Sequence, residues 1–200
     1  MNGIDFNDSL NKQQLTAVNC DEGNKLVLAG AGSGKTRVLT YRVAKLIKDF
    51  NIRPSDILAL TFTNKASREM KERIESLLRI SSQGLWFGTF HGICRRILKI
   101  HWKEAELSER FTILDSQDQL RLVKRIIKTN NLDEKLYDAK SIQSFINRKK
   151  DNGIRSNQTS EKDDEVYILV YKEYESILKQ TFSVDFADLI LKTYELLLNH

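Results

Sequence analysis

The sequence predicts an α/β fold in which a parallel sheet is followed by a helical region. In the first 90 residues, short apolar runs alternate with amphipathic ones, which is the pattern of β-α-β units. After about residue 90 only helical periodicity is left. A single proline in 200 residues also favours long helices. This length suffices for one domain, or for one domain that carries an insertion.

Three runs in the first part are predicted strands. Residues 25–29 and 56–62 are nearly continuous apolar runs, as expected for strands that are covered on both faces. Residues 85–87 form a shorter run between two glycines. Helices are predicted between these strands, over residues 35–49 and 64–78, because apolar side chains recur there at helical spacing.

The second part is predicted to be helical throughout. Its apolar stripes begin near residues 93, 120, 166 and 186. Ser116, followed three residues later by Gln119, resembles a capping box that would begin one of these helices. The acidic residues 163–165 have no apolar strand before them, so they are predicted to start a helix rather than to hold a metal. Residues 153–160 are predicted to be a loop.

The charge distribution points to a polyanionic partner. Residues 91–160 carry 15 Lys/Arg against 9 Asp/Glu, whereas residues 161–200 carry 4 against 9. A basic middle of this kind is typical of nucleic-acid binding, but a solvated helix face with mixed charges explains it equally well. The candidates for contact with a phosphate backbone are Arg95, Arg96, Arg148, Lys149 and Lys150.

Composition excludes several other classes of protein. No apolar run approaches the roughly 18 residues of a membrane span, and the N-terminus lacks the pattern of a secretory signal. We therefore expect a soluble, cytoplasmic protein. Cys20 and Cys94 are too few for a disulfide scaffold or a metal ligand set.

The segment AGAGSGKT, called here the phosphate loop (residues 29–36), follows a predicted strand and begins a predicted helix. Its glycines let the backbone turn tightly, so that successive N–H groups and the positive helix end face phosphate oxygens. Lys35 is predicted to reach the β- and γ-phosphates, and the Thr36 hydroxyl to bind Mg²⁺. The strict pattern has glycine where this chain has Ala29. The predicted nucleotide-binding residues of the loop are Ala29, Gly30, Ala31, Gly32, Ser33, Gly34, Lys35 and Thr36.

Four ordered segments together resemble the UvrD/Rep/PcrA family of superfamily 1 DNA helicases. They are LNKQQLTAV (10–18), the phosphate loop extended by Arg37, LALTFTNKASREMKERI (58–74) and GTFHGICRRIL (88–98). The resemblance covers essentially the whole chain. It implies an ATP-dependent 3′–5′ helicase of DNA repair or replication, with ATP and Mg²⁺ as cofactors. The partners that it implies are single-stranded DNA and single-strand/duplex junctions, with repair proteins or self-association as further candidates.

The resemblance also implies an architecture. Residues 1–90 would be the first part of a RecA-like P-loop NTPase motor domain, and residues 91–185 an all-helical inserted subdomain. Residues 186–200 would be a helix that returns toward the motor domain. The fold class is thus α/β, a partial RecA-like domain with a parallel sheet and a helical insertion.

Two adenine contacts follow from the resemblance. Gln14 matches the glutamine that hydrogen-bonds the adenine edge, and an amide can donate and accept at once, as that edge requires. A glutamine on an amphipathic helix is usually just solvated, however. Arg37 matches the arginine that stacks on adenine, although an arginine in the first helical turn can equally serve the phosphates.

DNA contacts follow from the resemblance as well. The matching residues are Thr61, Phe62, Thr63, Asn64 and His91. Phe62 lies at the carboxyl end of a predicted strand, where α/β sheets bind ligands, and it can stack on a base; packing in the core is the alternative. The other aromatic residues of the region, Trp86, Phe87 and Phe90, are predicted to be core residues rather than DNA platforms.

Hydrolysis requires more than a phosphate loop. Carboxylates must hold Mg²⁺ and orient water, and cations must stabilise the transition state. In the family, the acidic motif should come soon after a segment like residues 184–200. We therefore expect an N-terminal fragment that lacks ATPase and unwinding activity by itself. Two alternatives stay open, a helicase-nuclease subunit of RecB or AddA type and a DNA- or protein-binding module with a vestigial loop.

Overall fold

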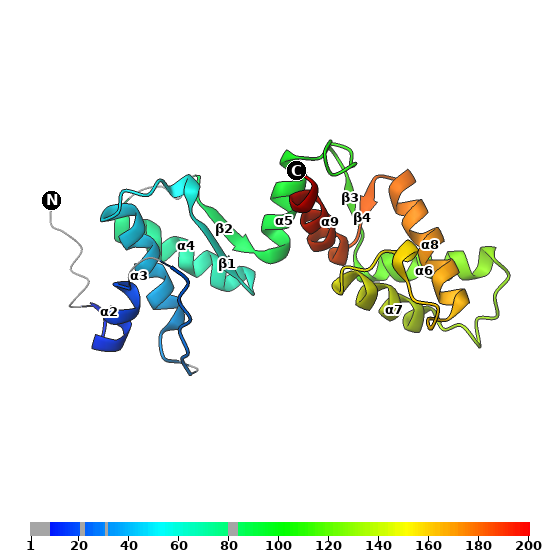
Figure 1. The fold of residues 1–200 in the computed structure, drawn as a ribbon, viewed down its shortest axis with the longest axis horizontal. Helices are drawn as coiled ribbons and strands as arrows, with labels where there is room; N and C mark the ends of the chain where they lie inside the picture. The colour runs from blue at the N-terminus through cyan, green and yellow to red at the C-terminus, as the bar shows by residue number, and fades with distance from the viewer. Residues whose placement is uncertain (1–8, 21–22, 31, 80–83) are drawn as a thin grey trace. The chain divides into compact units, whose positions relative to one another are not determined.

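The computed structural model describes residues 9–20, 23–30, 32–79 and 84–200. Contacts divide the chain into two units, Met1–Ile93 and Cys94–His200, and each is described by itself (Figure 1). The predicted domain limits at residues 90 and 185 stay predictions, although the helix after residue 185 is grouped with the second unit.

A β-α-β arrangement forms the centre of the first unit (Figure 1). Its elements are η1 (Pro54–Asp56), β1 (Leu58–Thr61), α4 (Asn64–Leu78) and β2 (Trp86–Thr89). The two strands are parallel, with Thr61 opposite Thr89, and parallel strands need a crossover such as α4. The predicted helix over residues 64–78 is confirmed, and so are the predicted strands over 56–62 and 85–87, with slightly different bounds.

Helices α3 (Lys35–Lys48) and α4 pack against the two strands. The core cluster between them contains Val43, Ile57, Ala59, Met70, Ile74 and Leu85. Phe87 packs against this cluster, as predicted, and Trp86 is half-buried. Leu58 alternates with Ala59 along β1 and is 57% exposed. The prediction that the strand over residues 56–62 is covered on both faces is therefore wrong at Leu58. Helix α2 (Lys12–Val18) and the preceding Leu10 pack on α3, where Leu10, Val18 and Tyr41 form a cluster.

The prediction of a strand over residues 25–29 is wrong for this structure. Residues 24–30 belong to no strand, and the side chains of Leu26 and Leu28 are 83% and 86% exposed. A strand exists only through hydrogen bonds to a neighbour, and among the described residues β1 and β2 pair with each other and with no third strand. The apolar sequence of residues 25–29 is therefore left without a sheet to join.

The second unit is mainly helical, as predicted. Its helices are the rest of α5 (Phe90–Ile100), then α6 (Ser116–Thr129), α7 (Ala139–Asp151), η2 (Ser156–Gln158), α8 (Glu165–Gln180) and α9 (Phe186–Asn199). The prediction missed a small parallel pairing between β3 (Thr112–Ile113) and β4 (Ser183–Val184). Segments of two residues are too short to show any periodicity in the sequence.

Two apolar clusters form the core of the second unit. The larger lies among α6, α7 and α8 and contains Val123, Ile126, Ile127, Ala139, Ile142, Phe145, Ile146, Val170, Tyr171, Tyr174 and Leu178. The other joins α5 to α9 and contains Leu98, Ala105, Leu107, Phe111, Val184, Leu189 and Leu196. Helix α9 therefore packs on elements of its own unit.

Helix caps in the second unit refine the sequence prediction. Asp115, not Ser116, caps α6, because its carboxylate accepts hydrogen bonds from the backbone N–H groups of Gln117 and Asp118. The capping box predicted at Ser116 is therefore wrong by one residue. Asp164 caps α8 in the same way, so the prediction that the acidic run starts a helix is confirmed.

Candidate nucleotide-binding site and strand edge

The phosphate loop leads directly into α3, which begins at Lys35. Gly34 caps this helix at a φ of 86°, and Gly32 has a φ of 74°, a backbone region in which glycine pays no steric penalty. Ala31, also predicted to bind nucleotide, lies outside the described residues. Two glycines of the described loop, on either side of Ser33, therefore have the left-handed conformation from which backbone N–H groups can converge on an anion.

The Lys35 ammonium group lies on the phosphate loop. Its Nζ donates hydrogen bonds to the carbonyl oxygens of Ala29, at 2.9 Å, and Gly30, at 2.6 Å. The hydroxyl of Ser33 donates to the same Gly30 carbonyl at 2.7 Å. The lysine is therefore positioned at the loop, as its place in the sequence predicted, and its charge is available to oxygen atoms held there.

Thr36 offers a single side-chain hydroxyl oxygen at the start of α3. Thr36 lies in the first turn of α3, and its carbonyl accepts a hydrogen bond from the Thr40 hydroxyl at 2.7 Å. Among the described residues, no group of three or more His, Cys, Asp or Glu side chains is placed to hold a metal. A Mg²⁺ ion would therefore depend on the Thr36 hydroxyl and on the oxygens of its nucleotide.

Among all the residues that the structure describes, no helix has the length and apolar character needed to cross a membrane.

Gln14 reaches the phosphate loop from α2. Its Nε2 donates a hydrogen bond to the Ser33 carbonyl at 3.0 Å. A Cβ atom added at Gly34 would lie only 2.7 Å from that nitrogen and would displace the amide, and the φ of 86° at this position also favours glycine. The structure thus brings Gln14 and the loop together, although the sequence separates them by about twenty residues.

Arg37 lies in the first turn of α3. Its guanidinium carbon is 5.9 Å from the centroid of the Tyr41 ring, one helical turn later. Both side chains line a cavity of about 480 Å³ together with Arg73 and other residues of α3 and α4. The arginine is exposed there and presents a planar group to the cavity.

Strands β1 and β2 end side by side, and an aromatic pair follows them. Phe62 is 93% exposed and Phe90 is 46% exposed, and their rings meet edge to face with 6.2 Å between centroids. The prediction that Phe90 is a core residue is therefore wrong. Phe90 starts α5 immediately after β2, so its ring lies at the carboxyl edge of the strands rather than under them.

The other predicted DNA-contacting residues surround this edge. The Thr63 hydroxyl caps α4 by accepting from the Ala66 N–H at 3.1 Å, and the Thr61 hydroxyl donates to the Thr63 carbonyl at 3.1 Å. Asn64 is exposed in the first turn of α4, and His91 is exposed in the first turn of α5. Two helix N-termini therefore begin beside the aromatic pair.

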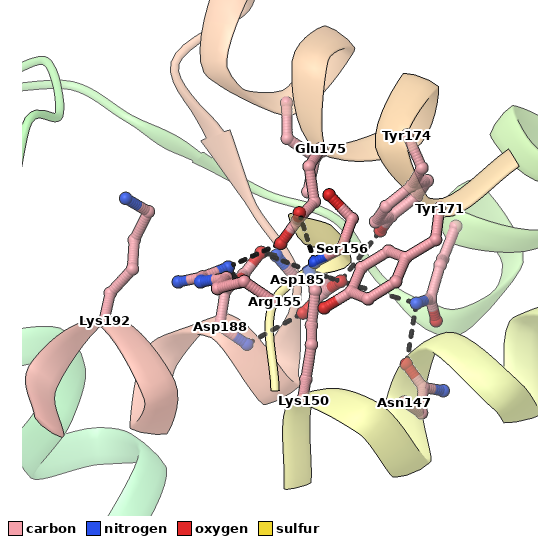
Figure 2. Close-up of polar contacts among 12 residues, drawn as sticks. Asn147, Lys150, Arg155, Ser156, Tyr171, Tyr174, Glu175, Asp185, Asp188 and Lys192 are labelled. Carbon is pink, nitrogen blue, oxygen red and sulfur yellow. Dashed lines mark hydrogen bonds and ion pairs between the residues drawn. The ribbon is translucent and has the colours of Figure 1, made fainter. Parts of the chain in front are cut away.

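One predicted phosphate contact, Lys150, is instead a buried structural group (Figure 2). Its side chain is completely buried, and Nζ lies 2.7 Å from Asp185 and 2.6 Å from Asp188. Both predicted roles of Lys150, a phosphate contact and a solvated charge, are therefore wrong. The residue instead neutralises two buried carboxylates, which are stable only beside a buried cation. Lys149 also forms an ion pair, in which its Nζ lies 2.6 Å from Oδ2 of Asp163.

Arg155, a residue of the predicted loop, completes the same network (Figure 2). It donates two hydrogen bonds to Glu195, at 2.6 and 2.7 Å, and single bonds to Asp188, at 2.8 Å, and Glu175, at 3.1 Å. The Ser156 N–H donates to the second oxygen of Glu175. The buried ion network, defined here as Lys150, Arg155, Glu175, Asp185, Asp188 and Glu195, therefore joins α7, α8 and α9.

Burial and charge shift the pKa values in this network in opposite ways. Burial raises the pKa of Asp188, but the charges of Lys150 and Arg155 outweigh burial and hold it below its ordinary value of 3.8. Burial and the neighbouring Asp185 charge raise the pKa of Tyr174, whose hydroxyl donates to Asp185 at 2.8 Å. The network is therefore a hydrogen-bonded unit with a structural role, in which the charged form of Asp188 is favoured.

Comparison with known proteins identifies the family. Residues 10–200 match the family model described as the UvrD/REP helicase N-terminal domain. The chain belongs to this family. It is 47% identical over 195 residues to DNA helicase II of Escherichia coli, covering 96% of this chain and 27% of that protein. It is 44% identical over 191 residues to the ATP-dependent DNA helicase PcrA of Bacillus subtilis, covering 94% of this chain and 26% of that protein.

The chain spans about a quarter to a third of the length of such relatives. A probable DNA helicase II homolog of Rickettsia felis is 43% identical over 207 residues, which cover all of this chain and 31% of that protein. The resemblance to the UvrD/Rep/PcrA family, first seen in four sequence motifs, is thereby confirmed. All three of these relatives are named as DNA helicases or as a probable homolog of one.

Sequence reasoning missed three contributors to these sites. Asn11 caps α2 and holds Gln14, and the spacing N-x-x-Q is a capping-box signature that could have been found. Phe90 was predicted to be a core residue, but its ring pairs with Phe62 at the end of the strands. Arg155 gave no signal at all, since its partners come from helices that start 10 and 31 residues later.

Proposed function

We propose that the chain is the ATP- and single-stranded-DNA-binding N-terminal part of an ATP-dependent DNA helicase. The full-length protein would move 3′ to 5′ on single-stranded DNA and unwind duplexes at single-strand/duplex junctions in repair or replication. The observation that carries the proposal is the placement of Lys35 and Gln14 on one glycine-rich loop at the start of α3. Family membership gives the class of reaction.

The proposal assigns a role to each group at the phosphate loop. Backbone N–H groups of Gly30 to Thr36 and the Lys35 ammonium would hold the β- and γ-phosphates, and the Thr36 hydroxyl would hold Mg²⁺. The Mg²⁺ ion neutralises charge on the phosphates when it is bound. Gln14 would bind the adenine edge. Arg37, exposed beside a cavity, would stack on the base.

The strand edge supplies the DNA-binding part of the proposal. Phe62 is almost fully exposed at the carboxyl end of β1, where it can stack on an unpaired base without any rearrangement of the core. Phe90 supports its ring from one side. Thr61, Thr63, Asn64 and His91 would contact the DNA backbone or bases around it. Nucleotide and DNA would thus be bound by the same small α/β unit.

The decisive experiment concerns Lys35. In the full-length protein, Lys35→Ala should lower DNA-stimulated ATP hydrolysis by about 100-fold or more, because a preorganised cation is removed from the phosphates. The matched control is Lys71→Ala, which removes an exposed lysine of α4 and should leave turnover unchanged. Retained ATPase activity in Lys35→Ala would contradict the proposal. The 200-residue chain alone should release essentially no phosphate from ATP.

The DNA-binding part is tested separately. Phe62→Ala in the full-length protein should weaken binding to oligo-dT by roughly 5- to 100-fold, since one base-stacking contact is lost. Phe50→Ala removes another exposed phenylalanine, which lies two residues after the end of α3, and serves as the control. Equal affinities of the two variants, measured by fluorescence anisotropy, would remove Phe62 from the DNA site.

A further inference from the structure

The side-chain amide of Gln14 is anchored on both sides. At the start of α2, the Gln14 backbone N–H donates to Asn11 Oδ1 at 2.8 Å, and the Asn11 backbone N–H donates to Gln14 Oε1 at 3.1 Å. On its other side, Gln14 Nε2 donates to the Ser33 carbonyl at 3.0 Å. The amide therefore links the N-terminus of α2 to the phosphate loop.

These anchors fix which end of the amide is oxygen and which is nitrogen. A flipped amide would place its NH₂ group against the Asn11 N–H and its oxygen against the Ser33 carbonyl. Donor would then face donor and acceptor would face acceptor, so both hydrogen bonds would be lost. The loop backbone also approaches the amide closely, because a Cβ atom added at Gly34 would lie only 2.7 Å from Nε2.

The anchored amide keeps one donor and one acceptor for a ligand. An amide oxygen has two lone pairs and an amide nitrogen has two hydrogens. Asn11 takes one lone pair of Oε1, and Ser33 takes one hydrogen of Nε2. The second lone pair of Oε1 and the second hydrogen of Nε2 are left for a ligand. Their positions are fixed because the amide is held at both ends.

We propose that Asn11 is a positioning residue that selects the base of the nucleotide through Gln14. This proposal rests on the function proposed above, in which a nucleoside triphosphate occupies the phosphate loop. Adenine presents a donor (N6–H) beside an acceptor (N7), whereas guanine presents two acceptors (O6 and N7) at the same positions. In the held amide, Oε1 would accept from adenine N6–H and Nε2 would donate to adenine N7. With guanine, Oε1 would face O6, and two acceptors would meet. A freely rotating amide turns its NH₂ group to either base.

On the α2 side, the capping box holds the orientation of the Gln14 amide. The Asn11 carboxamide oxygen fixes the first turn of α2, and the same turn presents the Asn11 N–H to Oε1. Replacing Asn11 by alanine removes the cap and leaves the Asn11 N–H in a frayed turn. Replacing it by aspartate keeps an oxygen acceptor of the same reach. A difference between the two variants therefore reports the effect of the capping oxygen, because both of them replace Asn11 and only one of them removes the cap.

The test measures base selectivity in the full-length protein. We expect Asn11→Ala to lower the ratio of kcat/KM for ATP to kcat/KM for GTP by about fivefold, the value of one net hydrogen bond. Asn11→Asp should keep the ratio of the unchanged protein. A cap with a merely structural role would lower both kcat/KM values equally and leave their ratio unchanged. An unchanged ratio in Asn11→Ala would therefore overturn the proposal.

A double-mutant comparison shows whether Asn11 acts through Gln14. In a Gln14→Ala background, Asn11→Ala should change the ATP/GTP ratio no further, because the amide that it positions is gone. An additional change in that background would assign the selectivity to another group and would contradict the positioning role.

A measurement without turnover separates this proposal from the proposed function. In the 200-residue chain, the two Gln14 side-chain NH₂ protons should give dispersed NMR signals, which collapse toward solvent-exposed values in Asn11→Ala and return in Asn11→Asp. Identical signals in all three proteins would overturn the positioning role, whatever the ATPase result. If the signals behave as expected but Lys35→Ala keeps full ATPase activity, the proposed function fails instead.

Discussion

Lys150 is the last of three consecutive cations at the end of α7, and only the environment of each side chain distinguishes them. Arg148 is exposed, Lys149 is half-buried beside Asp163, and Lys150 is completely buried between two aspartates. A charge that is removed from water is tolerated only with partners of opposite sign. The sequence shows the same three charges but cannot show which of them points inward.

Replacing Lys150 should therefore destabilise the chain strongly. Lys150→Met keeps the length of the side chain but leaves Asp185 and Asp188 without their buried cation, which costs about 3–5 kcal/mol in similar cases. Urea unfolding measures the change. Lys124→Met, on the exposed side of α6, is the control and should change the free energy of unfolding by less than about 0.5 kcal/mol. A loss below about 1 kcal/mol for Lys150→Met would contradict the structural role.

Asp188 gives the buried ion network a defined dependence on pH. Its pKa is lower in the folded chain than its ordinary value of 3.8, since Lys150 and Arg155 stabilise the carboxylate. The unfolded chain therefore binds the proton first as pH falls, and stability from this group is fully present above about pH 5 and is lost below about pH 4. Urea midpoints recorded from pH 6 down to 2.5 should fall less steeply for Asp188→Asn than for the unchanged chain. Glu161→Gln, at an exposed position, should keep the steep fall.

Among the secondary-structure elements, helices were predicted from the sequence more accurately than strands. The helix predicted over residues 64–78 has those bounds in the structure, because apolar spacing and the Thr63 cap are local properties. The strand predicted over residues 25–29 failed although its composition is strongly apolar. Strand formation depends on a neighbouring strand elsewhere in the chain, and no local pattern reports whether that neighbour is present.

Hydrogen exchange tests the state of residues 25–29. In the 200-residue chain, the backbone amides of these residues should exchange rapidly, whereas the amides of α4 that lie over the core should be protected. In the full-length protein, if further strands of the proposed motor domain flank this segment, the same amides should become protected. Strong protection of residues 25–29 in the 200-residue chain would contradict the unpaired state.

The candidate site was predictable to the extent that its contacts are local. Lys35 and Thr36 lie where the glycine pattern placed them, because loop and helix are consecutive. The family resemblance implied that Gln14 binds adenine, but neither the resemblance nor any local pattern predicted the contact between Gln14 and Ser33. The edge-to-face contact of Phe62 with Phe90 depends on the parallel register of two strands, which sequence periodicity does not specify.

The whole molecule consists of two units with separate interiors. The two core clusters of the first unit draw on residues 10–85, and the two clusters of the second unit draw on residues 98–196. The buried ion network also lies entirely in the second unit, between Lys150 and Glu195. The acidic stretch after residue 160 therefore serves in part to neutralise cations of α7 and of the loop after it, which accounts for some of the uneven charge along the chain.

Independent interiors predict that the second unit folds by itself. A fragment of residues 90–200 keeps α5 whole, both core clusters of the unit and all of the buried ion network. It should unfold cooperatively in urea, with coincident transitions in far-ultraviolet circular dichroism and tryptophan fluorescence from Trp102. Lys150→Met should lower its free energy of unfolding by the same amount as in the 200-residue chain, because the partners of Lys150 are all present. Separate transitions for the two probes, or a much smaller effect of Lys150→Met in the fragment, would show that the second unit needs the first to form its core.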